Sequence, residues 1–167
     1  MEPQVTQAEI ARAKKLHSML LFDFIVVHVF LFVIALGFIK SSFIPLYLMP
    51  VISFALLGNV LFKAKRAIIC ETSDFVLSHI LLAAQRARLF LLLFVVTGTL
   101  TAALLLGGAQ LDISKVAGYA LAFGIGQLPF MVVLLVLVVL EFDAEHQCSS
   151  GRVPAAALAL TQKTKKV

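Results

Sequence analysis

The chain contains no tryptophan, only two cysteines and few charged residues, since 14% of its 167 residues are Asp, Glu, Lys or Arg. A typical soluble domain carries charge on about a quarter of its residues and is at most half apolar. Here 61% of the residues are apolar, and the mean hydropathy is +1.03. This shortage of charge excludes an ordinary soluble domain and indicates an integral membrane protein.

Sequence motifs that identify common enzyme classes are also missing. The chain has no Rossmann glycine fingerprint, P-loop, HExxH metal motif or redox cysteine pair. It also lacks the paired cysteines of quinone-linked thiol oxidoreductases and the early membrane glutamate of small multidrug transporters. His146 and Cys148 alone do not make a metal site, which needs more ligands. We therefore expect neither a cofactor nor an enzyme.

Four long apolar runs make up most of the chain, at residues 19–39, 43–62, 89–108 and 116–140. A helix needs about 20 residues to cross a bilayer core of about 30 Å. We therefore predict an all-α membrane protein, a four-helix transmembrane bundle formed by a membrane domain at residues 1–150. The basic segment 151–167 is predicted to be a cytoplasmic tail, mobile over residues 155–167. The first run is too long for a signal peptide, so we expect it to be retained.

Lysine and arginine are distributed unevenly around these runs. Twelve of the 14 precede the first run, separate the second from the third, or follow the fourth, and only Lys40 and Lys115 lie on the other side. Basic residues concentrate on the cytoplasmic side of membrane proteins. We therefore expect cytoplasmic termini, in a plasma membrane or a bacterial inner membrane. Cys70 and Cys148 fall on the same side, where a disulfide is not expected.

Residues 63–88 are predicted to form a cytoplasmic helical projection between the second and third spans. Within it, residues 75–84 are apolar but only about half a span long. This stretch could be an interfacial helix or an extension of the third span, or it could dock another protein. The candidate docking residues are Phe75, Leu77, Ile80 and Leu81.

The basic residues that flank this projection could contact anionic lipid headgroups, at about 1 kcal/mol for each charge. These candidates are Lys63, Lys65, Arg66, Arg86 and Arg88. Their position beside apolar runs points to the bilayer and does not indicate a nucleic-acid partner.

Polar residues inside the spans are candidates for an intramembrane site, because lipid makes them costly. Judged by depth, Asp23 lies level with Asn59, and His28 lies level with Ser53, Thr97, Thr99 and, less closely, Gln127. Asp23 and His28 are five residues apart, about 140° around an α-helix, so we expect them on different faces. His28 could relay protons or hold the helices in register, and we expect the structural role. Asp23 could be an ion or proton site, but we expect a near-surface carboxylate that pairs with Lys63 or Asn59 or reaches the headgroups.

Two further patterns bear on cofactors and packing. A b-type haem needs a second axial histidine at the depth of His28, and neither His17 nor His79 meets this condition. Small residues four apart, at 118, 122 and 126 and at 98 and 102, form faces that allow close helix packing. We expect these faces to pack inside the bundle, with a homo-oligomer seam as the alternative.

Three hypotheses for function follow. The first is an accessory, assembly, regulatory or sensor subunit that acts by helix packing and contact with a protein partner. The second is a small transporter or proton-conducting protein that uses the His28 layer. The third, with least support, is a membrane enzyme or a b-type cytochrome.

Overall fold

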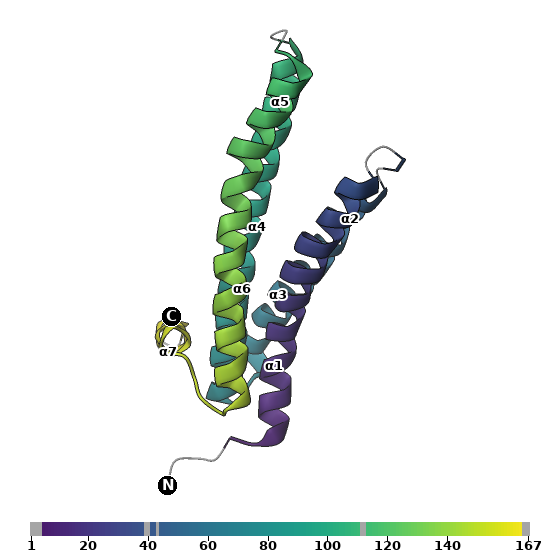
Figure 1. Ribbon diagram of the computed structural model, residues 1–167. Coiled ribbons are helices and arrows are strands. Elements are labelled where there is room, and N and C mark those ends of the chain that lie inside the picture. The colour runs from purple at the N-terminus through teal and green to yellow at the C-terminus, as the bar shows by residue number, and fades with distance from the viewer. Residues whose placement is uncertain (1–4, 39–40, 43, 111–112, 165–167) are drawn as a thin grey trace. The chain divides into compact units, whose positions relative to one another are not determined.

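The computed structural model describes residues 5–38, 41–42, 44–110 and 113–164 (Figure 1). Over these residues the protein consists of helices and short connections, with no strand. Four helical stretches are long and apolar enough to cross a membrane: Gln7–Phe38, Ile44–Cys70, Asp74–Gly107 and Val116–Ser149. The predicted all-helical class with four candidate spans is confirmed. Lys40 and the predicted span ends at residues 39 and 43 lie outside the described residues.

The first stretch is a continuous rod of α1 (Gln7–Leu21), the π-helix η1 (Phe22–Phe30) and α2 (Leu31–Phe38). Its start is a capping box. The Thr6 hydroxyl accepts from the Glu9 backbone N–H at 3.3 Å, and the Glu9 carboxylate accepts from the Thr6 N–H at 2.8 Å. Two backbone donors that the first helical turn leaves unpaired are thereby satisfied.

The remaining helices follow with short connections. They are α3 (Ile44–Cys70), α4 (Asp74–Gln110), α5 (Lys115–Leu121), the π-helix η2 (Ala122–Gln127), α6 (Leu128–Ser149) and α7 (Ala155–Thr164). Gly151, at φ 69°, adopts the left-handed conformation that glycine favours just after a helix. Pro129 lies inside a continuous helical stretch, because η2 runs directly into α6, so its missing N–H removes one hydrogen bond to the preceding turn.

The chain divides into two compact units. The first comprises Met1–Arg88 and Val138–Val167, and the second comprises Leu89–Leu137. In the first unit α3 packs antiparallel to the rod of α1, η1 and α2 (Figure 1). All of the buried polar or charged residues that the structure describes lie in this unit: His17, Asp23, His28, Ser53, Ser78, His79, Glu141 and Thr161. Any polar chemistry in the protein's interior therefore belongs to the first unit.

The second unit is a helical hairpin with an apolar interior. The rings of Phe90, Phe94 and Phe130 gather within it at centroid distances of 5.6 to 6.1 Å. Gly126 lies so close to α4 that an added Cβ would be 2.1 Å from the Thr101 hydroxyl. Ala122 is fully buried, whereas Gly118 and Gly98 have open space where a Cβ would lie. The predicted internal packing therefore holds for positions 122 and 126 of one small-residue face and for neither position of the other, since Ala102 is also exposed.

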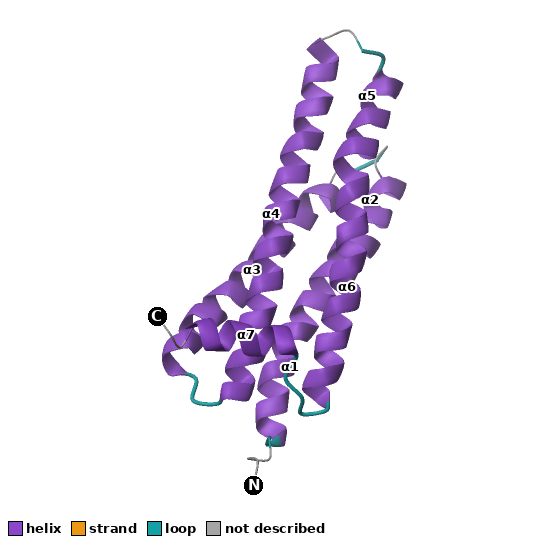
Figure 2. Ribbon diagram, turned by 90° about the vertical axis from the view of Figure 1, so that its left-hand side faces the viewer, coloured by secondary structure: helices purple, strands orange, loops and turns teal. Residues whose placement is uncertain are grey.

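The segment after α6 differs from its prediction. The prediction that residues 155–167 are mobile is wrong for residues 155–164, which form α7 (Figure 2). Ala157 is fully buried in a cluster with Leu82 and Ala144. The Thr161 hydroxyl also bonds that of Ser78 at 2.7 Å. The alanine-rich face of α7 thus buries apolar area that a free tail would expose.

The predicted docking segment, residues 75–84, is not an exposed surface. Residues 63–70 continue α3, and residues 75–84 are the first turns of α4, which matches the alternative of an extended third span. The side chains of Phe75, Leu77 and Ile80 are buried, and that of Leu81 is half-buried. Because the protein's own helices already cover them, these residues do not form an exposed docking face.

Candidate functional site: a buried histidine–glutamate network

Three buried side chains from distant parts of the chain meet in the first unit. They are His17 of α1, His79 of α4 and Glu141 of α6, each 0% exposed. His17 Nδ1 lies 2.5 Å from Glu141 Oε1, and His17 Nε2 lies 3.0 Å from His79 Nδ1. His79 Nε2 lies 3.0 Å from the backbone carbonyl oxygen of Arg152. The four groups form one unbroken line of hydrogen bonds.

Arg86 completes the network at its acidic end. Its Nη1 donates to Glu141 Oε2 at 2.7 Å and to the Leu140 carbonyl oxygen at 2.8 Å. The Arg86 side chain is only 12% exposed. Since this guanidinium is held inside the protein by Glu141, the prediction that Arg86 contacts lipid headgroups is wrong for this structure.

The periodicity of each helix explains why these polar residues are buried. His17 lies in a stripe of α1 whose other members are the buried residues Ala13, Leu16, Leu20 and Leu21. Such a spacing of three and four residues places a single helix face against the core. Glu141 occupies the same kind of position in α6, between buried Leu137 and Ala144. A buried polar group is costly unless it is hydrogen-bonded, and here each one finds a partner.

The directions of these bonds determine how many protons the line holds. A carbonyl oxygen only accepts, so His79 Nε2 must carry the hydrogen that reaches Arg152. Three hydrogen bonds link the carbonyl, the two imidazoles and the carboxylate, and each bond needs one hydrogen. Two neutral imidazoles and an ionised carboxylate supply only two. Every arrangement that makes all three bonds therefore holds one extra proton, on His17, His79 or Glu141.

Arg86 places a positive charge at the carboxylate end of this line, because its guanidinium donates to Glu141 Oε2. Further along the line, the rings of His17 and His79 lie edge to face with centroids 5.2 Å apart. The network makes one more internal hydrogen bond when it gains this single proton, and it breaks one when it loses the proton.

A second polar cluster lies further along the same rod. The Ser53 hydroxyl of α3 donates to Asp23 Oδ2 at 3.1 Å, and His28 Nδ1 donates to the Asp23 carbonyl oxygen at 3.0 Å. His28 Nδ1 also lies 3.7 Å from Asp23 Oδ1. Asp23, His28 and Ser53 are all fully buried. The expected pairing of Asp23 with Lys63 or Asn59 is replaced here by Ser53.

The expectation that Asp23 and His28 lie on different helix faces is wrong. It assumed a regular α-helix, whereas both residues lie in the π-helix η1. Hydrogen bonds in a π-helix run between residues five apart, so such residues stack on the same face. Single π turns occur often at functional sites, and here the π-helix brings two titratable side chains together.

The other predicted members of the intramembrane site are not joined to this cluster. Asn59 is exposed, and Thr97 donates its hydroxyl to the Leu93 carbonyl of its own helix at 2.7 Å. Thr97, Thr99 and Gln127 all belong to the second unit. Their proximity to His28 therefore stays a prediction. Among the residues described, no three His, Cys, Asp or Glu side chains are arranged to hold a metal ion.

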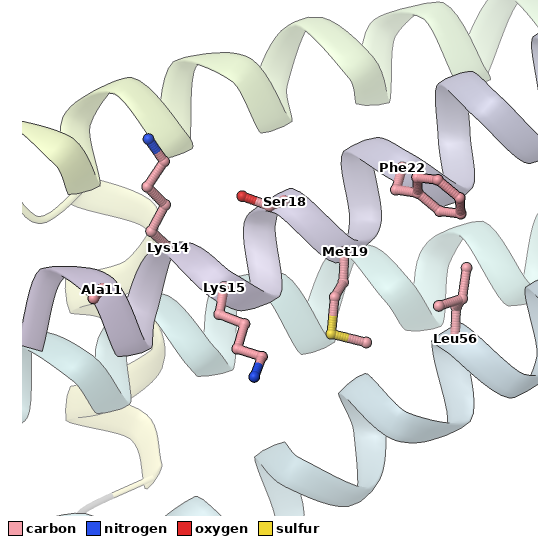
Figure 3. Close-up of a pocket in the computed structure, with 7 residues that line it drawn as sticks. All are labelled: Ala11, Lys14, Lys15, Ser18, Met19, Phe22 and Leu56. Carbon is pink, nitrogen blue, oxygen red and sulfur yellow. The ribbon is translucent and has the colours of Figure 1, made fainter.

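A groove beside α1 is another possible location for a functional site in the first unit. It is lined mainly by apolar side chains, and Figure 3 shows Met19 of α1 and Leu56 of α3 on opposite sides of the same space. Lys14 extends the other way, and its Nζ lies 3.5 Å from Glu145 of α6. This groove has no reactive group apart from its lysines, so we place the candidate site in the buried network.

No protein-family model, curated protein or solved structure matches this chain. Proposals about function therefore depend on the residues described above.

The sequence prediction missed Glu141 and the meeting of His17 with His79. One signal was present, because Glu141 is an acid placed directly after a 25-residue apolar run. The contacts themselves join residues 62 and 124 positions apart, which no local pattern reveals.

Proposed function

We propose that this protein is a multi-pass membrane protein of a plasma membrane or bacterial inner membrane, with both termini cytoplasmic. Four apolar helices of sufficient length and the uneven distribution of lysine and arginine support this. In this orientation the His17–His79–Glu141 network lies toward the cytoplasmic side.

We further propose that the protein is proton-linked, as a small transporter or a proton-conducting protein. The observation that carries this proposal is the line of three hydrogen bonds that requires one extra proton. Chains of histidine and acidic residues inside membrane proteins commonly form proton relays. The accessory-subunit hypothesis loses its proposed docking segment, because that segment is buried.

The second polar cluster would extend the path. Asp23 and His28 lie on the same rod as His17, roughly 9 and 16 Å further along it at 1.5 Å per residue. Both side chains are fully buried, and both can exchange protons. A proton would enter at the histidine pair and move inward toward His28.

Glu141→Gln provides the decisive test. A glutamine can accept from Arg86 and donate to a neutral His17, so all of the hydrogen bonds persist without the extra proton. We expect purified wild-type protein in liposomes to acidify the interior when a pH gradient is imposed, as read by a trapped pH-sensitive dye. Glu141→Gln should reduce this rate at least ten-fold, because an amide cannot titrate as a proton relay must. A ten-fold change in rate corresponds to ~1.4 kcal/mol in the activation free energy.

The matched control is Glu145→Gln, one turn along α6, where the carboxylate contacts surface groups at Lys14 and Ser18. Its rate should equal that of the wild type. A wild-type rate no higher than that of empty liposomes would contradict the proposal, as would an unchanged rate in Glu141→Gln.

A second candidate function is an accessory or regulatory subunit that acts through helix packing. One observation favours it: only 6% of the apolar part of the Asp74–Gly107 span is buried inside the protein. Gly98 in this span also has open space where a Cβ would lie. A small residue on an exposed transmembrane face allows close approach by another helix, from a protein partner or a second copy. Gly98→Leu should then abolish a co-purifying chain or a dimer in mild detergent, whereas Gly37→Leu, at another open glycine, should not.

A further inference from the structure

A second groove, with a volume of about 620 Å³, lies in the first unit where the ends of α3 and the first turns of α4 meet α7. One part of its wall is apolar, formed by Ile68, Leu81 and Leu160. The other part is polar and basic, formed by Gln85, Arg88 and Lys163. The groove thus combines a surface for hydrocarbon with two positive charges.

The groove depends on the packing of α7 against α4. Buried Ala157 and the hydrogen bond between the hydroxyls of Thr161 and Ser78 attach one face of α7. The residues that follow are only half covered, so Leu160 is half-buried and Lys163 is exposed. Lys163 and Arg88 therefore both line the groove, although the two are 75 positions apart in the sequence.

The charges in this groove are not neutralised. Its lining contains no acidic residue, and within the described part of the chain neither Arg88 nor Lys163 takes part in an ion pair. Two other cations of the first unit are paired, Lys14 with Glu145 and Arg86 with Glu141. The groove therefore offers a net positive site of the kind that an anion fills.

We propose that this groove binds one anionic phospholipid of the cytoplasmic leaflet. The phosphate would lie between Arg88 and Lys163, with the Gln85 amide as a further donor. An acyl chain would cover Ile68, Leu81 and Leu160. Arg88 directly precedes the third apolar run, which is where the headgroup layer is expected to lie. The inference uses the membrane orientation proposed above and is independent of the proton-linked role.

Lipid retention measures this directly. The purified full-length protein would be placed in nanodiscs with equal amounts of phosphatidylglycerol and phosphatidylcholine, and retained lipid counted by native mass spectrometry. We expect one tightly held phosphatidylglycerol per chain. Loss of a cation near an anionic headgroup weakens binding about five-fold, so Arg88→Gln with Lys163→Gln should weaken retention roughly thirty-fold.

The control is the double variant Arg12→Gln with Lys15→Gln, which removes the same charge from exposed positions of α1 outside the groove lining. It should retain the lipid. Equal loss in both double variants would overturn the proposal in favour of diffuse surface charge. Undiminished retention in the groove variant would also overturn it, as would displacement of the lipid by millimolar inorganic phosphate. The single variant Lys163→Gln changes only an exposed residue, so its expected loss, about five-fold, tests the same site if the double variant misfolds.

Discussion

Nδ1 of His17 lies 2.5 Å from Oε1 of Glu141, although 124 residues separate them and both side chains are fully buried. The contact joins the first helix of the chain to α6, and Arg86 of α4 reaches the same carboxylate. Three helices therefore converge on one acid. A proton that arrives at or leaves this network changes a bond between helices, which is how protonation would be coupled to helix movement.

Glu141→Ala should strongly destabilise the protein. It leaves the guanidinium of Arg86 buried without its partner, and breaking a buried ion pair in this way costs about 3–5 kcal/mol. Glu145→Ala, at the partly exposed pair with Lys14, should cost about 1 kcal/mol or less. The free energy of unfolding of both variants can be compared by denaturation in mixed micelles. Equal losses would mean that Glu141 has no special structural role.

His28→Gln tests whether the path continues into the π-helix. An amide can donate to the Asp23 carbonyl as His28 does, but it cannot titrate near neutral pH. We therefore expect a folded protein whose proton flux in liposomes falls at least ten-fold, which corresponds to ~1.4 kcal/mol in the activation free energy.

The matched control for this substitution is His146→Gln, which makes the same change at an exposed residue. Its flux should stay at the wild-type level. Unchanged flux in His28→Gln would place His28 outside the path and restore the structural role that the sequence favoured.

The sequence predicted those parts of the fold that depend on local chemistry. Hydropathy located the four apolar helices, and the Thr6–Glu9 spacing is typical of the capping box that begins α1. Both features follow from residues within a few turns of each other. The identity of the buried residues Asp23 and His28 as candidates came from the same local comparison of polarity with depth.

The parts that could not be predicted depend on helix type and on distant contacts. An α-helical wheel places Asp23 and His28 on different faces, and no residue in this segment predicts the π-helix that brings them to the same face. Depth along the spans separates His17 and His79 from His28 and gives no sign of their contact with each other. The order of the C-terminal helix α7 arises from apolar surface on α4 and α6, which is not visible in the basic sequence of the tail.

Gly126→Ala should destabilise the second unit. The added methyl would meet the Thr101 hydroxyl at 2.1 Å and the Thr101 Cβ at 3.2 Å, so the two helices must separate. Overpacking of this kind typically costs about 1–3 kcal/mol. Gly118→Ala has open space in the same span and should be close to neutral in a thermal unfolding assay. Adding Thr101→Ala to Gly126→Ala should recover part of the loss, and a fully additive double variant would contradict this packing.

The two native cysteines can test the proposed orientation without any substitution. Cys70 is exposed at the end of α3, whereas Cys148 is fully buried in α6. A membrane-impermeant maleimide should therefore leave the protein unlabelled in intact cells and should label Cys70 alone in inside-out vesicles. Ser114→Cys in a Cys70→Ser background provides the control, because exposed Ser114 lies in the predicted external connection and should react in intact cells. Labelling of Cys70 from outside would reverse the orientation and place the buried histidine network toward the external face.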